Sequence, residues 1–166
     1  EEARRLLGQR GKLFAHQCDV TDSRRVYELA DIAQQEMGGV DILVNCAGYV
    51  AGGDFLDRPD ADWERTVAVN LTSILYTTRV FLPGMYEQNS GHVVNISSAA
   101  GTIGVAGLSM YAATKWEVWG LTESLRFEAL MSGRPGVRFS SIHPSYIAHG
   151  MFEGAKLRGI SSLLVP

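Results

Sequence analysis

Short apolar runs alternate with longer amphipathic segments along the chain. The short runs predict strands, and they lie at residues 12–18, 41–45, 92–97 and 137–143. In the longer segments apolar residues recur every three or four positions, which predicts helices over 23–37, 60–88 and 109–131 and a helix end over 3–8. Strands that alternate with helices indicate a single α/β domain with a parallel sheet and right-handed crossovers.

The residues between the runs predict where these elements begin and end. Asp22 or Ser23 can cap the helix that follows, and Gly38 can end it. Pro83 is expected to kink the helix over 60–88 near its end, because proline cannot donate the helical hydrogen bond. The continuous apolar run 41–45 is typical of a strand that is buried on both faces of a parallel sheet.

Small or polar residues follow each of the four predicted strands. Ligands of parallel α/β sheets bind beyond the carboxyl ends of the strands, so these clusters predict one shared site. The clusters are Cys18-Asp19-Val20-Thr21, Asn45-Cys46-Ala47-Gly48, Ser97-Ser98-Ala99 and His143-Pro144-Ser145.

Tyr111 and Lys115 are four residues apart at the start of the predicted helix 109–131, which places them on one helical face. A phenol is a weak base at neutral pH, but a nearby ammonium favours the phenolate and lowers the phenol's pKa. Such a pair can exchange a proton with an alcohol or a carbonyl. An exposed pair with no catalytic role is the alternative for this motif alone.

Two further residues favour a catalytic role of Tyr111 and Lys115 over an exposed pair without one. Ser98 lies at a strand end thirteen residues before Tyr111. Asn70 lies inside a predicted helix, although asparagine is a poor helix former. Together with Asp19 and the turn Asn45–Gly48, these residues resemble the short-chain dehydrogenase/reductase family over nearly the whole chain. The resemblance implies a Rossmann-like doubly wound sheet in a three-layer α/β/α arrangement.

The resemblance implies a role for each of four residues. Tyr111 would be the general acid/base, and Lys115 would lower its pKa and bind the nicotinamide ribose. Ser98 would orient the substrate oxygen, and Asn70 would hold a water that links Lys115 to solvent. Ser97 is the rival of Ser98, but the spacing favours Ser98, and alternation along a strand points Ser97 the other way.

The cofactor implied by the resemblance is NAD or NADP. Asp19 would contact the adenine, and the turn Asn45–Gly48 resembles the family's Asn-Asn-Ala-Gly, with Cys46 in place of the second Asn. Two structural alternatives stay open, since Asn45 can join strands without touching cofactor and Cys46 can be a small buried hydrophobe. The residues expected to contact the cofactor are Asp19, Val20, Asn45, Ala47, Gly48, Tyr111, Lys115, Pro144 and Ile147.

The segment after Pro144 departs from the family pattern. His149 occupies the position of a threonine that helps to seat the nicotinamide amide, and it can still donate a hydrogen bond or point to solvent. The run Gly150–Gly154 resembles the branch that holds retinol and 17β-hydroxysteroid dehydrogenases. This narrower resemblance implies a small apolar alcohol or carbonyl substrate.

The family's glycine-rich phosphate-binding turn is not found in the sequence, and neither is the residue that selects NAD or NADP. In the family's strand order the runs 12–18 and 41–45 would be strands three and four, with strands one and two between them. Without those strands a gap of about 14 Å would separate the two runs. We therefore expect this chain to be a fragment that lacks the first two strands and the last one.

Composition narrows the class of protein further. The chain of 166 residues has a formal net charge of −3, which argues against a nucleic-acid partner. Its two cysteines form no disulfide framework or zinc site and favour a reducing, cytoplasmic location. The longest uncharged run, 93–114, is interrupted by polar residues and glycines, so no membrane span is expected.

Several smaller expectations remain. Trp116 and Trp119 could form a subunit interface of a homodimer or homotetramer, as the family commonly does through this helix, or pack within the monomer. His16 and His143 are expected to be core histidines with satisfied hydrogen bonds.

The predicted function is an NAD(P)-dependent oxidoreductase that interconverts an alcohol and a ketone or aldehyde. The alternatives are a non-catalytic nucleotide-binding protein and an inactive fragment of such an enzyme.

Overall fold

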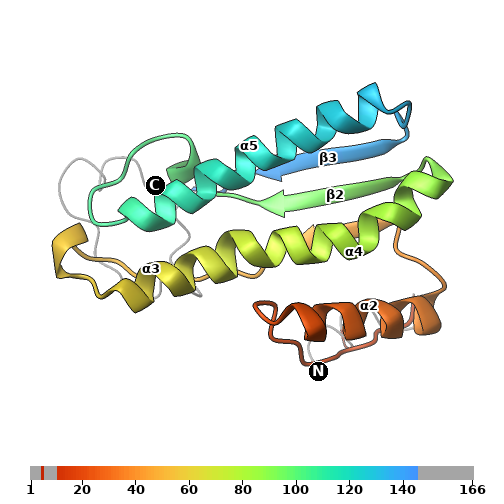
Figure 1. Ribbon diagram of the computed structural model, residues 1–166, viewed down its shortest axis with the longest axis horizontal. Helices are drawn as coiled ribbons and strands as arrows, with labels where there is room; N and C mark the ends of the chain where they lie inside the picture. The colour runs from red at the N-terminus through yellow and green to blue at the C-terminus, as the bar shows by residue number, and fades with distance from the viewer. Residues whose placement is uncertain (1–4, 6–10, 146–166) are drawn as a thin grey trace.

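The computed structural model describes residue 5 and residues 11–145, and these form a parallel three-stranded sheet with helices (Figure 1). The strands are β1 (Ile42–Asn45), β2 (Gly91–Ile96) and β3 (Val137–Ile142), in that order across the sheet. Asn45 is paired with Asn95 in the β1–β2 register, and Ile96 with Ile142 in the β2–β3 register. The predicted parallel α/β fold is therefore confirmed.

The helices fill the segments between the strands. Their bounds are α2 (Ser23–Met37), α3 (Asp60–Val67), α4 (Ser73–Gln88) and α5 (Ser109–Met131), with a π-helical turn η2 (Ala68–Thr72) and short 3₁₀ turns η1 (Phe55–Asp57) and η3 (Ala99–Gly101). The Asp22 side chain accepts a hydrogen bond from the backbone N–H of Arg24, and Gly38 ends α2 with a φ of 78°. Both predicted boundaries of this helix are confirmed.

The predicted helix over 60–88 exists, but it is not uniform. It consists of α3, the π-helical turn η2 and α4, which follow one another without a break. Pro83 lies inside α4, and the helix continues past it to Gln88. The interruption that matters for the site is therefore η2 and not Pro83, because η2 carries Asn70.

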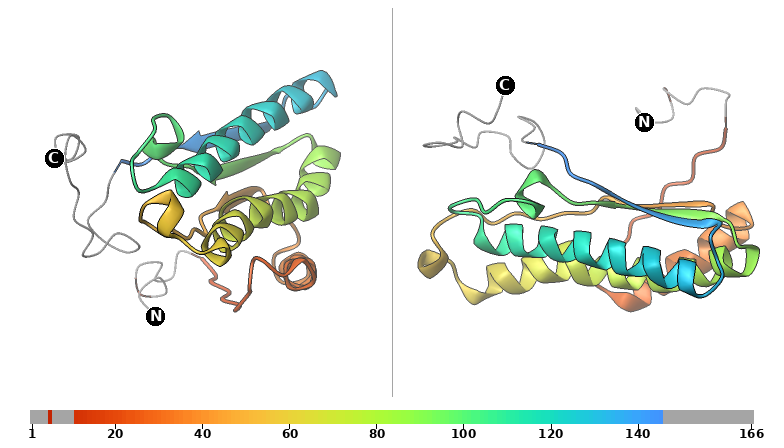
Figure 2. Two further views of the ribbon diagram at one scale, coloured as in Figure 1. Left: turned by 60° about the vertical axis from the view of Figure 1, so that its left-hand side comes forward. Right: turned by 90° about the horizontal axis from the view of Figure 1, so that it is seen from above.

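Helices α4 and α5 run side by side along one face of the sheet, and α2 packs against α4 (Figures 1 and 2). Alternate residues of β2 point into this layer and are buried, as the side-chain period of a strand requires. The core between the sheet and the helices contains Met85, Val93, Ala129, Val137 and Phe139. This layer fixes where the carboxyl ends of the strands lie relative to α5.

The other face of the sheet is open within the described residues. Ile42 is 63% exposed and Val44 is 54% exposed, and both belong to the edge strand β1. The prediction that the run 41–45 is buried on both faces is therefore wrong. Its physical reason is that the described helices cover only one face and that β1 has a strand neighbour on one side only.

The run 12–18 does not form a strand, so that prediction is also wrong. A strand needs a neighbour for its backbone groups, and the described sheet contains only β1, β2 and β3. Leu13 and Phe14 are 37% and 40% exposed. His16 is exposed as well, and its Nε2 lies 2.8 Å from Glu36 Oε2, so it is not the core histidine that the sequence predicts.

The predicted helix end over 3–8 falls almost entirely outside the described residues. Among the residues that the structure describes, no helix is both long enough and apolar enough to cross a membrane.

Candidate active site

The start of α5 meets the carboxyl end of β2 at one edge of the sheet. Ser98 follows β2 directly, whereas Tyr111 and Lys115 lie in the first two turns of α5. The element contacts are dense here because η3 folds back from Ser98 onto α5. Three of the predicted catalytic residues are thus brought together by two elements that are consecutive in the sequence.

Tyr111 and Lys115 are both buried, with exposed fractions of 4% and 3%. The Lys115 ammonium lies 5.6 Å from the centre of the Tyr111 ring, so the two residues share one side of the helix as predicted. Lys115 Nζ donates a hydrogen bond to the backbone carbonyl of Ile96 at 2.8 Å. The ammonium is therefore held against the last residue of β2.

Burial controls the ionisation of this pair. It raises the pKa of the Tyr111 phenol above its ordinary value, and a hydrogen bond with the Ser98 side chain opposes that rise. Burial lowers the pKa of Lys115, and the charge of Cys46 opposes that change. The expected lowering of the Tyr111 pKa by Lys115 is not found here, because the desolvation of the phenol is the larger effect.

The two serines after β2 have different surroundings. Ser98 Oγ accepts a hydrogen bond from the backbone N–H of Ala100 and bonds with Tyr111, whereas Ser97 is buried and donates to the carbonyl of Lys115 at 2.8 Å. The two serine side chains therefore have different partners on α5, and the choice of Ser98 over Ser97 stays a prediction. The Ser97 hydroxyl thereby connects the end of β2 to the backbone of α5.

Gly101 allows this close approach of η3 to α5. A Cβ at this position would lie 2.6 Å from Ser97 Oγ and 2.7 Å from the Lys115 carbonyl oxygen. Those separations are shorter than van der Waals contact, so a side chain here would push η3 away from the helix. Glycine is thus required at this turn for steric reasons.

Asn70 lies on η2 and is completely buried. Its Oδ1 accepts a hydrogen bond from the Tyr49 N–H at 2.7 Å, and its Nδ2 donates to the Tyr49 carbonyl at 2.9 Å and to Thr114 Oγ1 at 3.1 Å. A π-helical turn interrupts the regular helical ladder and is frequent at functional sites. The unusual asparagine inside a helix is thereby explained, since its side chain ties the helix to the loop after β1 and to α5.

The side chain of Asn45 joins strands, which is one of the two alternatives that the sequence left open for this residue. Its Nδ2 donates to Asn95 Oδ1 at 2.8 Å, and its Oδ1 accepts from Thr77 Oγ1 at 2.7 Å. Asn95 in turn donates to Thr122 Oγ1 at 2.9 Å. A buried polar chain thus connects α4, β1, β2 and α5, and it uses both polar ends of the Asn45 amide.

The remaining residues after β1 lie at the open edge. Ala47 is exposed and Gly48 is half-buried, so neither places a large side chain over the strand end. Cys46 is exposed, which contradicts the interpretation of this residue as a small buried hydrophobe. The reason is its position just beyond an edge strand, where nothing in the described chain covers it.

Asp19 and Val20 lie just before α2, and Asp19 is near Arg65, whose guanidinium lies over the ring of Tyr49. Asp19 is exposed, and its Oδ1 accepts hydrogen bonds from the Thr21 N–H at 2.9 Å and the Thr21 hydroxyl at 2.7 Å. These bonds lower the pKa of the Asp19 carboxyl, the side-chain bond more than the backbone one. Val20 is half-buried.

The segment after β3 is described only in part. The Pro144 carbonyl accepts a hydrogen bond from the Ala99 N–H at 2.8 Å, which fixes Pro144 beside η3. His143 Nδ1 lies 3.2 Å from the Ser98 carbonyl and its Nε2 lies 3.0 Å from Ser141 Oγ, so this histidine is satisfied as predicted. The expectations for Ile147, His149 and residues 150–154 lie outside the described residues.

The two tryptophans of α5 were expected either to form a subunit interface or to pack within the monomer, and their surroundings fit each alternative in part. Trp119 packs with its ring at 5.4 Å from the ring of His143 in an edge-to-face arrangement, which is a contact within the chain. Trp116 is 46% exposed and Trp119 is 38% exposed. Both therefore also present apolar surface on the outer side of α5.

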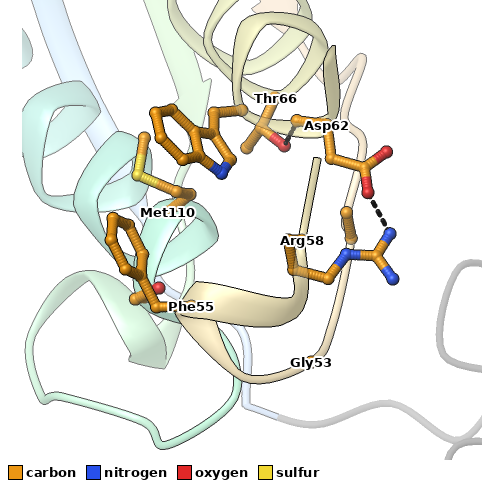
Figure 3. A pocket seen from close by; sticks show the side chains of 9 residues that line it. Gly53, Phe55, Arg58, Asp62, Thr66 and Met110 are labelled. Carbon is orange, nitrogen blue, oxygen red and sulfur yellow. Dashed lines mark hydrogen bonds and ion pairs between the residues drawn. The ribbon is translucent and has the colours of Figure 1, made fainter. Parts of the chain in front are cut away.

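A small pocket of about 10 Å³, with room for about one water molecule, lies beside the start of α5, between that helix, η1 and α3 (Figure 3). Phe55 and Met110 form apolar walls, and Trp63 stacks on Phe55 with ring centres 5.4 Å apart. Arg58 and Asp62 form an ion pair at one side of the cavity (Figure 3). Met110 lines this pocket, but its neighbour in the sequence, Tyr111, does not.

Sequence reasoning did not identify Thr114, Tyr49 or the polar chain through Thr77, Asn95 and Thr122. The signal that could have found the threonines is their spacing. Thr114 and Thr122 are eight residues apart on α5, so they share a helical face, and that face is otherwise buried. A hydroxyl on a buried face needs a partner, and the buried asparagines supply it.

The residues at this edge suit part of a nicotinamide dinucleotide. Lys115 and Tyr111 present an ammonium and a hydroxyl at the carboxyl end of β2, and Ala47 and Gly48 leave the end of β1 without bulk. Such donors suit a ribose, and a strand end without bulk allows close approach of a flat ring.

Comparison with known proteins agrees with this fold. The family model of the short chain dehydrogenases matches residues 1–157. The chain is 42% identical over 147 residues to the short-chain dehydrogenase/reductase family 16C member 6 of Bos taurus, covering 89% of this chain and 46% of that protein. It is 41% identical over 156 residues to epidermal retinol dehydrogenase 2 of Mus musculus, covering 93% and 50% respectively.

A solved structure is similar as well. A short-chain dehydrogenase from Streptomyces avermitilis superposes with a TM-score of 0.80 at 30% sequence identity, covering 92% of this chain and 55% of that one. A parallel α/β sheet with its site at the strand ends is the architecture of nucleotide-binding dehydrogenases. The chain belongs to the short-chain dehydrogenase/reductase family, and its similarity to retinol dehydrogenases is in agreement with the narrower resemblance in the sequence. It spans about half the length of the curated relatives it matches.

Proposed function

We propose that the protein containing this chain is an NAD(P)-dependent oxidoreductase that interconverts an alcohol and a ketone or aldehyde. The observation that carries the proposal is the bonded group at the start of α5, in which Ser98 bonds with Tyr111 while Lys115 lies behind the phenol ring. A neutral phenol beside a serine hydroxyl and an ammonium can pass a proton to or from a substrate oxygen. The family relationship supports the same class of reaction.

In the reductive direction Tyr111 donates its phenolic proton to the carbonyl oxygen of the substrate. Ser98 Oγ donates a hydrogen bond to the same oxygen and stabilises the charge that develops on it. A bound nicotinamide would supply the hydride for the carbonyl carbon, and the reverse reaction would return it. Lys115 stabilises the phenolate that remains on Tyr111 by its positive charge.

Asn70 has a supporting role in this proposal. Both N–H groups of its side-chain amide donate to Tyr49 and Thr114, so a water that links Lys115 to solvent would bind as a donor, to the Asn70 amide oxygen or to a backbone carbonyl of η2. A π-helical turn is suited to this, because its carbonyls are displaced from the regular hydrogen-bond ladder.

The proposed substrate is a small apolar alcohol or carbonyl compound. The observation that supports it is the similarity to relatives named retinol dehydrogenases. We also propose self-association as a homodimer or homotetramer through the outer side of α5, supported by the exposed Trp116 and Trp119. Light scattering of the full-length protein would contradict this part if it gave the monomer mass.

Replacement of Tyr111 tests the proposed reaction. In the full-length protein, turnover of an apolar alcohol is followed by the absorbance of the reduced nicotinamide with NAD and with NADP. Tyr111→Phe removes the proton donor but keeps the ring, so we expect kcat to fall by a factor of about 10² to 10⁴. The replacement Tyr76→Phe on α4 is the control, and it should leave kcat unchanged.

The alternatives predict different results in the same assay. A non-catalytic nucleotide-binding protein would bind NADH or NADPH and turn over no alcohol or carbonyl compound. An inactive protein would show neither binding nor turnover. Full activity of Tyr111→Phe would contradict the assigned role of the phenol even if the wild-type protein is active.

A further inference from the structure

Two buried threonines on α5 make the same pair of hydrogen bonds. Thr114 Oγ1 accepts from Asn70 Nδ2 at 3.1 Å and donates to the carbonyl of Tyr111 at 2.8 Å. Thr122 Oγ1 accepts from Asn95 Nδ2 at 2.9 Å and donates to the carbonyl of Val118 at 2.6 Å. Both threonines have an exposed fraction of 0%. In each case a threonine hydroxyl connects an asparagine of another element to the backbone of α5.

The two connections differ in what they join. Asn95 lies on β2, so the Thr122 connection fixes α5 to the middle of the sheet. Asn70 lies on the π-helical turn, so the Thr114 connection fixes η2 to the turn of α5 that carries Tyr111 and Lys115. Only the Thr114 hydroxyl donates to the backbone of the proposed general acid/base.

The anchor of the Thr114 connection is rigid. Asn70 also exchanges two hydrogen bonds with the backbone of Tyr49, at 2.7 and 2.9 Å, so its amide cannot turn without breaking them. On the other side of the same helical turn, Ser97 Oγ donates to the Lys115 carbonyl. The start of α5 is thus held from two directions, by Thr114 toward η2 and by Ser97 toward the end of β2.

We propose that Thr114 is a positioning residue of the proposed reaction, which sets the place of the Tyr111 hydroxyl relative to Ser98 by holding the backbone of Tyr111 against Asn70. This inference rests on the proposed function. A displacement of reacting groups by about 1 Å can lower the rate by a factor of about 10². Since the bond with Ser98 opposes the rise of the Tyr111 pKa, loss of this placement would also let that pKa rise further.

The experiment compares matched variants of the two threonines in the full-length protein. Thr114→Val and Thr122→Val each remove one buried hydroxyl of the same geometry and keep the shape of the side chain. Thr114→Ser and Thr122→Ser keep the hydroxyl and serve as conservative variants. If a valine variant does not fold, the pair Thr114→Ala and Thr122→Ala replaces it.

Three quantities are measured for each variant. These are kcat and KM for an apolar alcohol, the pH dependence of kcat, and the pKa of Tyr111 in the cofactor-free protein. The last is obtained by NMR of protein labelled with ¹³C at tyrosine Cζ, and the resonance that disappears in Tyr111→Phe identifies Tyr111. This measurement does not depend on turnover.

For Thr114→Val we expect kcat to fall by about tenfold to 10²-fold with a KM changed by less than about twofold, and the pH profile and the Tyr111 pKa to move to higher pH. Thr114→Ser should restore the wild-type pH profile. Thr122→Val should lower stability without moving either pH-dependent quantity. An equal shift in Thr114→Val and Thr122→Val, or no shift of the Tyr111 pKa in Thr114→Val, would overturn the inference.

Failure of the proposed function gives a different result. In that case Tyr111→Phe keeps full turnover or the wild-type protein has none, whereas the NMR titration still compares the two threonine variants. If Tyr111→Phe is inactive and the two threonine variants behave alike, the proposed function stands and only the role of Thr114 is contradicted.

Discussion

Lys115 and Asp19 are both charged residues that the family resemblance assigns to the cofactor, but they are held in different ways. Lys115 is 3% exposed and donates to the carbonyl of Ile96 on a neighbouring strand. Asp19 is exposed and accepts hydrogen bonds from Thr21, two residues further along the chain. One side of the candidate site is thus fixed by contacts between elements, and the other only by a local turn.

The difference follows from the elements that surround each residue. The strand β2 has a neighbour on both sides and helices over one face, so the elements that position Ser98, Tyr111 and Lys115 belong to the described chain. The run 12–18 before Asp19 has no strand partner among the described residues. The proposed proton transfer therefore depends on elements that are described, whereas the proposed adenine contact would depend on strand neighbours of the run 12–18.

The largest effect is expected at Lys115. In the full-length protein Lys115→Met removes the charge that stabilises the phenolate, so kcat should fall by a factor of about 10² to 10⁴.

The same variant tests the burial of the ammonium. Burial lowers the pKa of Lys115 in the folded state, so the unfolded chain keeps this proton to higher pH and the folding stability rises with pH in that alkaline window.

Lys115→Met should therefore lose that alkaline rise in stability, measured by urea unfolding at a series of pH values. Burial raises the pKa of Tyr111, which acts in the opposite direction, since its contribution is lost as the pH rises through the folded-state value. The double variant Tyr111→Phe/Lys115→Met separates the two. A stability curve of Lys115→Met that matches the wild type would show that the ammonium is solvated.

A smaller effect is expected at Gly101, where the tight contact between η3 and α5 can be disturbed without removing a functional group. Gly101→Ala places a Cβ against Ser97 Oγ and the Lys115 carbonyl, so the free energy of unfolding should fall by about 1 to 3 kcal/mol. The control is Gly104→Ala, because a Cβ there would have no atom within 4 Å. Equal stability of the two variants would show that η3 adapts easily.

The smallest effect is expected on the Asp19 side. Thr21→Val removes the hydroxyl bond that contributes most to the low pKa of the Asp19 carboxyl, so this pKa should rise toward its ordinary value. A lowered carboxyl pKa stabilises the folded state at neutral pH, and this contribution is lost as the pH falls through the folded-state value. NMR titration of the Asp19 carboxyl carbon measures the change, and an unchanged pKa would contradict the role of Thr21.

The same contrast explains how far the sequence could predict the molecule. Periodicity and capping residues located α2 and α5 correctly, because Asp22, Gly38 and the apolar spacing act within a few residues of one another. The strand over 12–18 was predicted from its apolar content alone, but a strand forms only with a partner. Burial of 41–45 on both faces failed for a similar reason, since it depends on layers outside the segment.

For the site, the sequence identified Ser98, Tyr111 and Lys115 as neighbours, and the structure brings them together. It could not show that Asn70 is occupied by Tyr49 and Thr114, because these contacts join residues 21 and 44 positions apart. Nor could it decide between the two alternatives for Asn45, whose partner Asn95 is 50 positions away. Pairing of buried polar groups over such separations is set by packing, which a single sequence does not display.

The π-helical turn Ala68–Thr72 has a consequence for helical phase. Each residue of an α-helix advances the side-chain direction by about 100°, and a π-helical turn contains more residues than an α-helical one. Deletion of one residue within the turn would therefore restore a regular helix from Asp60 to Gln88 but rotate one half of it relative to the other. Either α3 or α4 would then present a different set of side chains to its neighbours, and the Asn70 amide would leave Tyr49 and Thr114. The irregular turn thus lets one continuous helix satisfy two different packing surfaces.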